Sequence, residues 1–467
     1  MNSRTLVEQC SRHALAAALL LAAAPVRPEP VLPAGGQVVA GSASISLPGA
    51  GQMLVTQASP RAVIDWTSFS IGQGAAVHFA NGQGATLNRV LAFEPSLIAG
   101  ALSASGSLWL INPAGIVVTA SGRVNTGGHF IAATAILDPA GFMGEGRVTL
   151  ETSAAQLRLE GEVATGGDLV LVGHEIVQGG RASARGEAAL VAAGRVVLQD
   201  AGGDSRIRIE HAGGGGGDLT VEGRIAAAAA DLRAVGGNVY ALAADTSGLA
   251  RASEIRVEGG RIRLVAAGDA KLAGTIDASG PTGGDVDITA GSRVILTADA
   301  RLSARGSAGD GGRIRIGGAR QGGLPGETRP LAPAQAVFVD PGALIDAGST
   351  SARGGEVILW AEQRTRFDGL IRADGPAGGG FVETSARDSL EIGLGQVEVG
   401  NGKWLLDPRD VIITLGGFTI SPPFEPSYTI APPVGDTAYN VNSTSLVAAL
   451  NAGSNITVTT SVSGATM

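Results

Sequence analysis

A glycine pair, followed by one residue of any type and then an apolar residue, recurs along most of this chain. Between residues 216 and 311, successive pairs begin 20, 23, 24 and 28 residues apart. This spacing is too short for a four-stranded propeller blade and is typical of one coil of a β-solenoid. The pairs begin at residues 35, 127, 166, 216, 236, 259, 283, 311, 354 and 378.

Apolar residues alternate with charged residues after these pairs, as in Val286-Asp287-Ile288 and Ile314-Arg315-Ile316. A spacing of two predicts β-strands in which alternate side chains point to one buried face. We therefore expect a buried set and a water-facing set. The buried set is Val286, Ile288, Ile314 and Ile316, and the water-facing set is Asp287 and Arg315.

A second strand precedes four of the glycine pairs. An apolar residue with Ala two positions later lies 7, 9, 9 and 7 residues before the pair, at Ile276, Leu302, Ile345 and Ile371. This pattern predicts a strand, a glycine-rich corner and the next strand. Because one coil cannot bury its inward face alone, neighbouring coils must stack with strands ~4.8 Å apart. The sequence predicts an all-β, pectin-lyase-like parallel β-helix over roughly 35–416, right-handed because crossovers between parallel strands prefer that hand.

The composition suits this fold and excludes other classes. Glycine contributes 72 of 467 residues, hydrophobic residues reach 44% and aromatic residues only 4%. Disordered chains lack that hydrophobicity. The net charge of −8 comes without any basic run, which disfavours a nucleic-acid partner. Cys10 is the only cysteine, so disulfides and cysteine-based zinc sites are excluded.

The two ends of the chain differ from the repeats. Residues 1–24 contain an eleven-residue apolar run at 14–24 and predict a secretory signal peptide. The run is too short to span a bilayer, which needs ~20 apolar residues, so no transmembrane segment is expected. Residues 25–34 form a Pro-rich spacer, and prolines in 317–335 predict a loop between coils. Residues 417–467 form a Pro-rich break and begin a further strand at Asn455, so we expect the array to be truncated.

Residues 107–119 consist of two apolar β-type runs joined by Asn112-Pro113-Ala114-Gly115. Asn at the first position, Pro at the second and Gly at the fourth are favoured by a type I turn, because Pro fixes φ and Asn bonds its own backbone. We expect substitutions in this turn to cost only ~1 kcal/mol.

Asn112-Pro113-Ala114-Gly115-Ile116 resembles the Asn-Pro-Asn-Gly-Ile motif of the filamentous haemagglutinin family, the exoproteins of two-partner secretion. Further similarities follow in the same order over residues 35–140, and Leu87-Asn88-Arg89-Val90 stands where the family has Asn-Pro-Asn-Leu. The resemblance implies a capping and secretion domain at 35–150 and β-helix repeats at 151–416. Ala114 departs from the family motif.

The resemblance also implies a function. Such a chain is a secreted, adhesin-like or haemagglutinin-like β-helical stalk that passes through the periplasm to the surface of a Gram-negative cell. An outer-membrane transporter with periplasmic POTRA domains is expected to recognise the N-terminal domain, and β-augmentation is one mode of recognition. The expected secretion motif is Asn112, Pro113, Ala114, Gly115 and Ile116, together with Leu87, Asn88, Arg89 and Val90.

Two alternatives stay open. A β-helical polysaccharide-degrading enzyme would need a carboxylate cluster, but Asp285 and Asp287 lack a third acid or an aromatic platform in the sequence around them. The five histidines do not fall at metal-ligand spacing. We therefore expect no catalytic residues, cofactor or metal. The other alternative is the stalk of a contact-dependent toxin, with an unknown surface ligand in either case.

Overall fold

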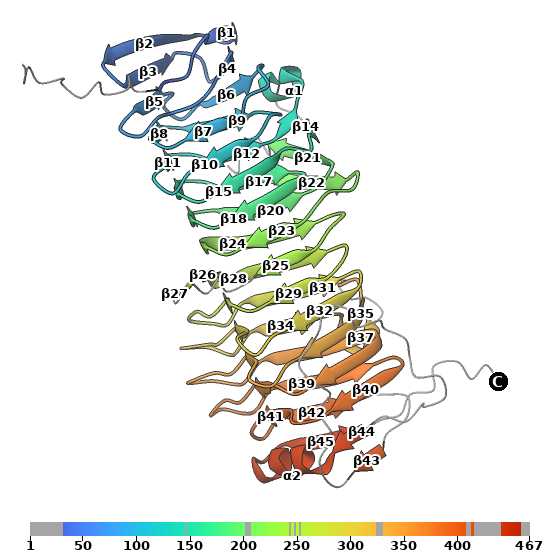
Figure 1. The fold of residues 1–467 in the computed structure, drawn as a ribbon. Helices are drawn as coiled ribbons and strands as arrows, with labels where there is room; N and C mark the ends of the chain where they lie inside the picture. Colours follow the sequence, from blue (N-terminus) through green and yellow to red (C-terminus); the bar gives the residue numbers. More distant parts are fainter. Residues whose placement is uncertain are drawn as a thin grey trace, which may run out of the picture.

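The structure, a computed structural model, describes residues 31–144, 147–200, 207–241, 244–246, 249–251, 254–323, 330–407, 412–414 and 440–458. The predicted signal peptide, most of the Pro-rich spacer and the break after residue 417 lie outside these segments. Figure 1 shows one elongated stack of strands, with β1 (Gln37–Ala40) at one end and α2 (Ser443–Asn451) at the other. No helix in the described segments is long and apolar enough to cross a membrane.

The stack has three faces, and within each face the strands of successive coils pair in parallel. The first face continues from β4 (Arg61–Trp66) through β6 (Ala85–Val90), β9 (Ser107–Ile111), β12 (Phe130–Ala133), β17 (Leu169–Gly173), β20 (Glu187–Ala192), β24 (Arg224–Ala234), β28 (Glu254–Ala266), β31 (Asp285–Ala290), β34 (Arg313–Ile316), β37 (Glu356–Phe367), β39 (Phe381–Ala386) and β42 (Lys403–Leu406) to β45 (Asn455–Val458).

The second face contains β7 (Ser96–Ile98), β10 (Ile116–Val118), β15 (Gln156–Leu159), β18 (Glu175–Gln178), β23 (Leu219–Val221), β25 (Val239–Ala241), β29 (Ala270–Leu272), β32 (Arg293–Leu296), β35 (Ala334–Val339), the end of β37, β40 (Ser389–Ile392), β44 (Asn440–Asn442) and β43 (Ile412–Thr414). The third face contains β3 (Gln52–Gln57), β5 (Ala76–Ala80), β8 (Ala101–Ala104), β11 (Arg123–Thr126), β16 (Glu162–Thr165), β19 (Arg181–Ala184), the starts of β24 and β28, β30 (Thr275–Asp277), β33 (Arg301–Ser303), β36 (Leu344–Asp346), β38 (Leu370–Arg372) and β41 (Gln396–Glu398). The predicted all-β parallel β-helix is confirmed.

The inward side chains form one continuous apolar core, as the period of two predicts. Ile276 pairs with Leu302, Leu302 with Ile345 and Ile345 with Ile371, so the four predicted strands stack in one column. All four residues are buried, as are the alanines two positions later. Val286, Ile288, Ile314 and Ile316 are also buried, which confirms the predicted inner face.

The glycine pairs occupy two different corners of the coil, so their spacing does not measure one repeat. The pairs before Leu219 and Val239 open strands of the second face, where these two residues pair with each other. The pairs at 283, 311 and 354 instead precede β31, β34 and β37 of the first face. Glycine is required at this corner because a Cβ on Gly311 would lie 1.9 Å from the carbonyl oxygen of Ala347. The prediction that one glycine pair marks each coil is therefore wrong.

An additional layer covers the outside of the first face at the N-terminal end. It consists of α1 (Pro139–Met143) and the antiparallel sheet of β13 (Ala135–Ile136), β14 (Arg147–Thr152), β21 (Arg195–Asp200) and β22 (Ile207–Gly213). Outward side chains from β4, β6, β9, β12 and β17 form a second apolar core beneath it, in which the rings of Trp109 and Phe142 lie 5.5 Å apart. Strands of this region are therefore buried on both sides.

Antiparallel strands also close the N-terminal end of the stack. β1 pairs with β4, and β2 (Ala43–Gly49) pairs with β3. A small hairpin of β26 (Ala244–Thr246) and β27 (Leu249–Arg251) projects from the middle of the stack (Figure 1).

A strap, formed by residues 317–323 and 330–333, covers the outside of the first face farther along. It includes the short helix η1 (Arg320–Gly322) and contacts the face through the Thr289 hydroxyl, which donates to the Ala332 carbonyl, and through Arg320, whose guanidinium lies 4.0 Å from the Phe381 ring centroid. Asp287 and Arg315 are consequently buried, with 4% and 2% of their surfaces exposed. The prediction that these two side chains face water is wrong, because alternation identifies the inner face but not what covers the outer one.

Asp287 and Arg315 occupy paired positions on adjacent coils, and Arg315 Nε lies 2.7 Å from Asp287 Oδ1. The same column continues to Ile358 and then to Glu383. Glu383 is fully buried, and its carboxylate accepts hydrogen bonds from the backbone N–H of Gln321 in the strap at 3.1 and 3.2 Å. Burial raises the pKa of Glu383 to about 7, assisted by the charge of Asp407 and opposed by the Gln321 and Ser385 hydrogen bonds and by Arg320.

We expect Arg315→Ala to destabilise the protein by about 3–5 kcal/mol, because it leaves the Asp287 carboxylate buried without its arginine. The double variant Asp287→Leu/Arg315→Met should recover most of this loss, since replacing both partners removes the uncompensated charge. Arg372→Ala, at a partly exposed ion pair with Glu398, is the matched control and should cost ~1 kcal/mol or less. Urea unfolding measures all three, and equal losses for the two single variants would contradict the expectation.

Glu383 should make the protein more stable in weak acid. Since its pKa is raised in the folded state from 4.5 to about 7, the folded state holds the proton more tightly. This contribution is complete below pH ~4.5 and is lost as pH rises through about 7, by roughly 3 kcal/mol at most. Glu383→Gln keeps an acceptor for the Gln321 amide and should remove this part of the pH dependence in urea titrations at pH 5–8.5. The exposed Glu160→Gln should keep the wild-type slope, and a Glu383→Gln slope equal to wild type would refute the assignment.

Candidate functional site

The two segments predicted as the secretion motif lie on adjacent strands. β6 carries Leu87, Asn88, Arg89 and Val90, and it pairs in parallel with β9, which ends directly before Asn112. Leu87 is opposite Trp109, Asn88 opposite Leu110 and Arg89 opposite Ile111. Residues 20 or more positions apart in the sequence are thus brought into one site near the N-terminal end of the stack.

Asn112 is fully buried at the end of β9 and makes the expected turn. Its Oδ1 accepts from the Ala114 amide at 2.8 Å, and its carbonyl accepts from the Gly115 amide at 3.2 Å. Gly115 has φ of +125°, a backbone conformation that favours glycine. Pro113 and Ala114 are half-buried at the tip of the turn.

The Asn112 side chain also reaches beyond its own turn. Its Nδ2 donates to the Glu94 carbonyl at 2.9 Å and to the Ser96 hydroxyl at 3.0 Å. The Ser96 amide in turn donates to the Gly115 carbonyl at 2.9 Å. Asn112 therefore joins the turn to the segment that connects β6 with β7, and an estimate of ~1 kcal/mol for its loss is too small, because several buried groups would lose their partner.

Asn88 points into the main core, where its amide satisfies two buried groups. Its Oδ1 accepts from the Trp66 indole Nε1 at 2.9 Å, and its Nδ2 donates to the Trp109 carbonyl at 3.1 Å. Leu87, its neighbour, points outward into the second core. β6 is thus fixed from both sides by alternate side chains.

Arg89 and Val90 complete the predicted set. Arg89 forms a two-pronged ion pair with Asp65 on the adjacent coil, with both N–O distances 2.8 Å. The pair is partly exposed, whereas Val90 belongs to the main core. Ile116 is also buried in the main core. Of the predicted motif, only Arg89, Pro113 and Ala114 present appreciable surface to a partner.

The exposed residues of this region are ones that the sequence did not indicate. Leu91, Phe93 and Leu97, in and beside the segment between the two motif parts, are exposed apolar side chains. Apolar residues outside a periodic strand carry no sequence signal of exposure, since they are equally compatible with a buried loop. Their link to Asn112 through Glu94 and Ser96 is visible only in three dimensions.

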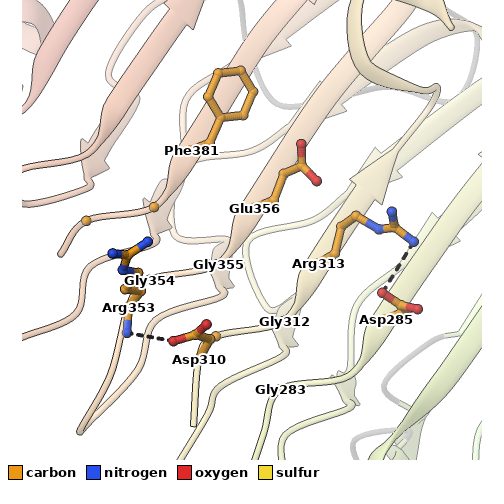
Figure 2. Close-up of a pocket in the computed structure, with 13 residues that line it drawn as sticks. Gly283, Asp285, Asp310, Gly312, Arg313, Arg353, Gly354, Gly355, Glu356 and Phe381 are labelled. Carbon is orange, nitrogen blue, oxygen red and sulfur yellow. Dashed lines mark hydrogen bonds and ion pairs between the residues drawn. The ribbon is translucent and has the colours of Figure 1, made fainter. Parts of the chain in front are cut away.

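A groove of about 640 Å³ on the first face tests the enzyme alternative. Figure 2 shows its glycine-lined floor and its side chains Asp285, Asp310, Arg313, Arg353, Glu356 and Phe381. Asp285 forms an ion pair with Arg313 at 3.4 Å, and the Asp310 carboxylate accepts from the Arg353 amide at 3.0 Å. Two of the three carboxylates therefore hold adjacent coils together. Among the described residues, no group of three or more His, Cys, Asp or Glu side chains is placed to hold a metal ion.

Comparisons with known proteins agree with this picture. A family model described as the TPS secretion domain matches residues 30–316. A heme/hemopexin-binding protein of Haemophilus influenzae is 33% identical over 172 residues, which are 36% of this chain and 19% of that protein. A second Haemophilus influenzae protein of the same description is 37% identical over 101 residues, or 21% of this chain and 11% of that one. Each match thus spans about a fifth or less of the relative's length.

A solved structure extends the similarity to the fold. The secretion domain of HMW1 from Haemophilus influenzae superposes with a TM-score of 0.64 and 25% sequence identity. The match covers 80% of this chain and 100% of the HMW1 domain. The β-helix and its N-terminal end are therefore shared with a domain known for secretion.

We expect Asn112→Ala to destabilise the protein by about 3 kcal/mol, because the Glu94 carbonyl and the Ala114 amide lose their buried partner. Pro113→Ala, at the half-buried tip, should cost ~1 kcal/mol or less. Asn125→Ala, which removes an exposed asparagine from β11, is the control and should change stability by less than about 0.5 kcal/mol. Urea unfolding of the purified variants measures the order, and an Asn112→Ala loss no larger than that of Asn125→Ala would show that the Asn112 hydrogen bonds contribute little.

Proposed function

The chain belongs to the TPS secretion domain family, and we propose that an outer-membrane transporter recognises its N-terminal end during two-partner secretion. The single observation that carries this proposal is the family match over residues 30–316. The clustering of both predicted motif segments on β6, β9 and the following turn supports it. Secretion takes the protein through the outer membrane to the cell surface.

We propose that the transporter binds through periplasmic POTRA domains after an N-terminal signal peptide, within residues 1–24, has directed export to the periplasm. β-augmentation is a mode that the fold permits. β2 pairs only with β3 in the described part of the chain, so its other edge offers backbone donors and acceptors to a partner strand. The exposed Leu47 on this strand would supply an apolar contact.

The chain beyond the secretion site is proposed to be a non-enzymatic stalk. Residues 35–150 hold both motif segments, and residues 151–416 continue the same three-faced stack. The carboxylates of the groove in Figure 2 are engaged in contacts between coils, which supports a structural role over catalysis. An adhesin or haemagglutinin is the form of exoprotein we favour, and a toxin stalk would use the same coils.

The test is co-expression of residues 1–467 with and without the two-partner secretion transporter of the same bacterium. We expect the chain in the culture medium only when the transporter is present, and in the periplasm when it is absent. A transporter without its periplasmic domains should leave the chain in the periplasm. Release without any transporter, or periplasmic retention with the intact one, would contradict the proposal.

A further inference from the structure

Three apolar side chains are exposed between β6 and β10, beside the buried secretion motif. Leu91, Phe93 and Leu97 are 62%, 98% and 49% exposed, respectively. Single exposed leucines are ordinary on protein surfaces, but a phenylalanine with almost all of its surface in water, flanked by two leucines within seven residues, is an unusual exposure of apolar area. We call Leu91, Phe93 and Leu97 the apolar loop.

The apolar loop is held in this exposed position by hydrogen bonds on both sides of Phe93. Before it, the Leu91 amide donates to the Trp66 carbonyl at 2.9 Å. After it, the Glu94 carbonyl accepts from Asn112 Nδ2 at 2.9 Å, and the Leu97 amide donates to the Ser70 hydroxyl at 3.1 Å. The fold thus fixes the backbone of the loop without burying its side chains.

The motif itself is inaccessible to a partner that meets the folded domain. Asn88 and Asn112 have no exposed surface, and their polar atoms are bonded to Trp66, Trp109, Glu94 and Ser96. A partner at this end of the stack would instead meet the apolar loop and the turn tip at Pro113 and Ala114. The geometry therefore separates buried residues that shape the site from exposed residues that can be touched.

We propose, resting on the proposed function, that the apolar loop is a contact surface for the transporter, which would receive Phe93 in an apolar pocket of its periplasmic part. Aromatic side chains that enter pockets dominate many interfaces. A second copy of this chain is a poorer occupant, because three side chains bury on the order of a few hundred Å², well below the roughly 1,200–2,000 Å² of a stable interface. A small apolar contact instead suits a partner that must release the chain.

The experiment uses the full chain co-expressed with its transporter and compares secreted with periplasmic protein. Phe93→Ser should lower the secreted amount by about tenfold, and Phe93→Leu should restore part of it. Leu394→Ser, which removes an apolar side chain of 52% exposure near the opposite end of the stack, is the matched control and should be secreted normally. The urea midpoint of each purified variant should equal that of the wild type, because the altered side chains have few contacts in the fold.

The outcomes separate the surface from the function. Normal secretion of both Phe93→Ser and Leu91→Ser, with wild-type secretion still dependent on the transporter, would overturn the apolar loop as the contact and leave the proposed function standing. Wild-type secretion without the transporter would overturn the proposed function itself. A dimer of the purified wild type that Phe93→Ser converts to monomer would assign the loop to self-association and overturn the transporter contact. A lowered urea midpoint for Phe93→Ser that accounts for its secretion loss would show a structural role and overturn the proposal as well.

Discussion

Parallel strands stacked in register place each side chain directly beside its equivalents on the coils before and after, and the rest of this structure depends on that constraint. A residue outside the core cannot be chosen independently, since like charges on adjacent strands repel and unlike charges attract. The outer column of the first face satisfies this rule in two ways. It is apolar at Val63, Leu87, Trp109, Ile131, Val170 and Ala189, and then alternates in charge at Asp231, Arg263, Asp287 and Arg315.

The cover over each part of that column follows its chemistry. The antiparallel sheet and α1 lie over the apolar part, where they complete a second core. The strap lies over part of the charged column and meets it with the Gln321 amide at Glu383 and with the Arg320 guanidinium above Phe381. Each buried carboxylate discussed here has a donor, which is the condition for keeping charge or polarity away from water.

The sequence predicts the inner face well and the outer face poorly, and the reason is physical. Alternation distinguishes the two sides of a strand, so Val286 and Ile314 were correctly assigned to the core, but it does not reveal a second layer above Asp287 and Arg315. One signal was available: strands buried on both faces have continuous apolar runs, and Leu108-Trp109-Leu110-Ile111 and Leu169-Val170-Leu171-Val172 are such runs. For the candidate site, the sequence identified Asn112 and its turn. It did not indicate that Asn112 is buried, because the partners Glu94 and Ser96 belong to a different coil.

The stacking of one coil on the next also determines how far apart in the chain two contacting residues are. Ile345 pairs with Ile371, 26 residues later, and Leu219 with Val239, 20 residues later, while the strap lengthens one step to the 43 residues between Leu302 and Ile345. These separations do not grow along the array, so each added coil closes a loop of similar size and similar entropic cost. A chain of this architecture has the same folding problem at every step, whatever its total length, and the already folded coil provides the strand edges on which the next one forms.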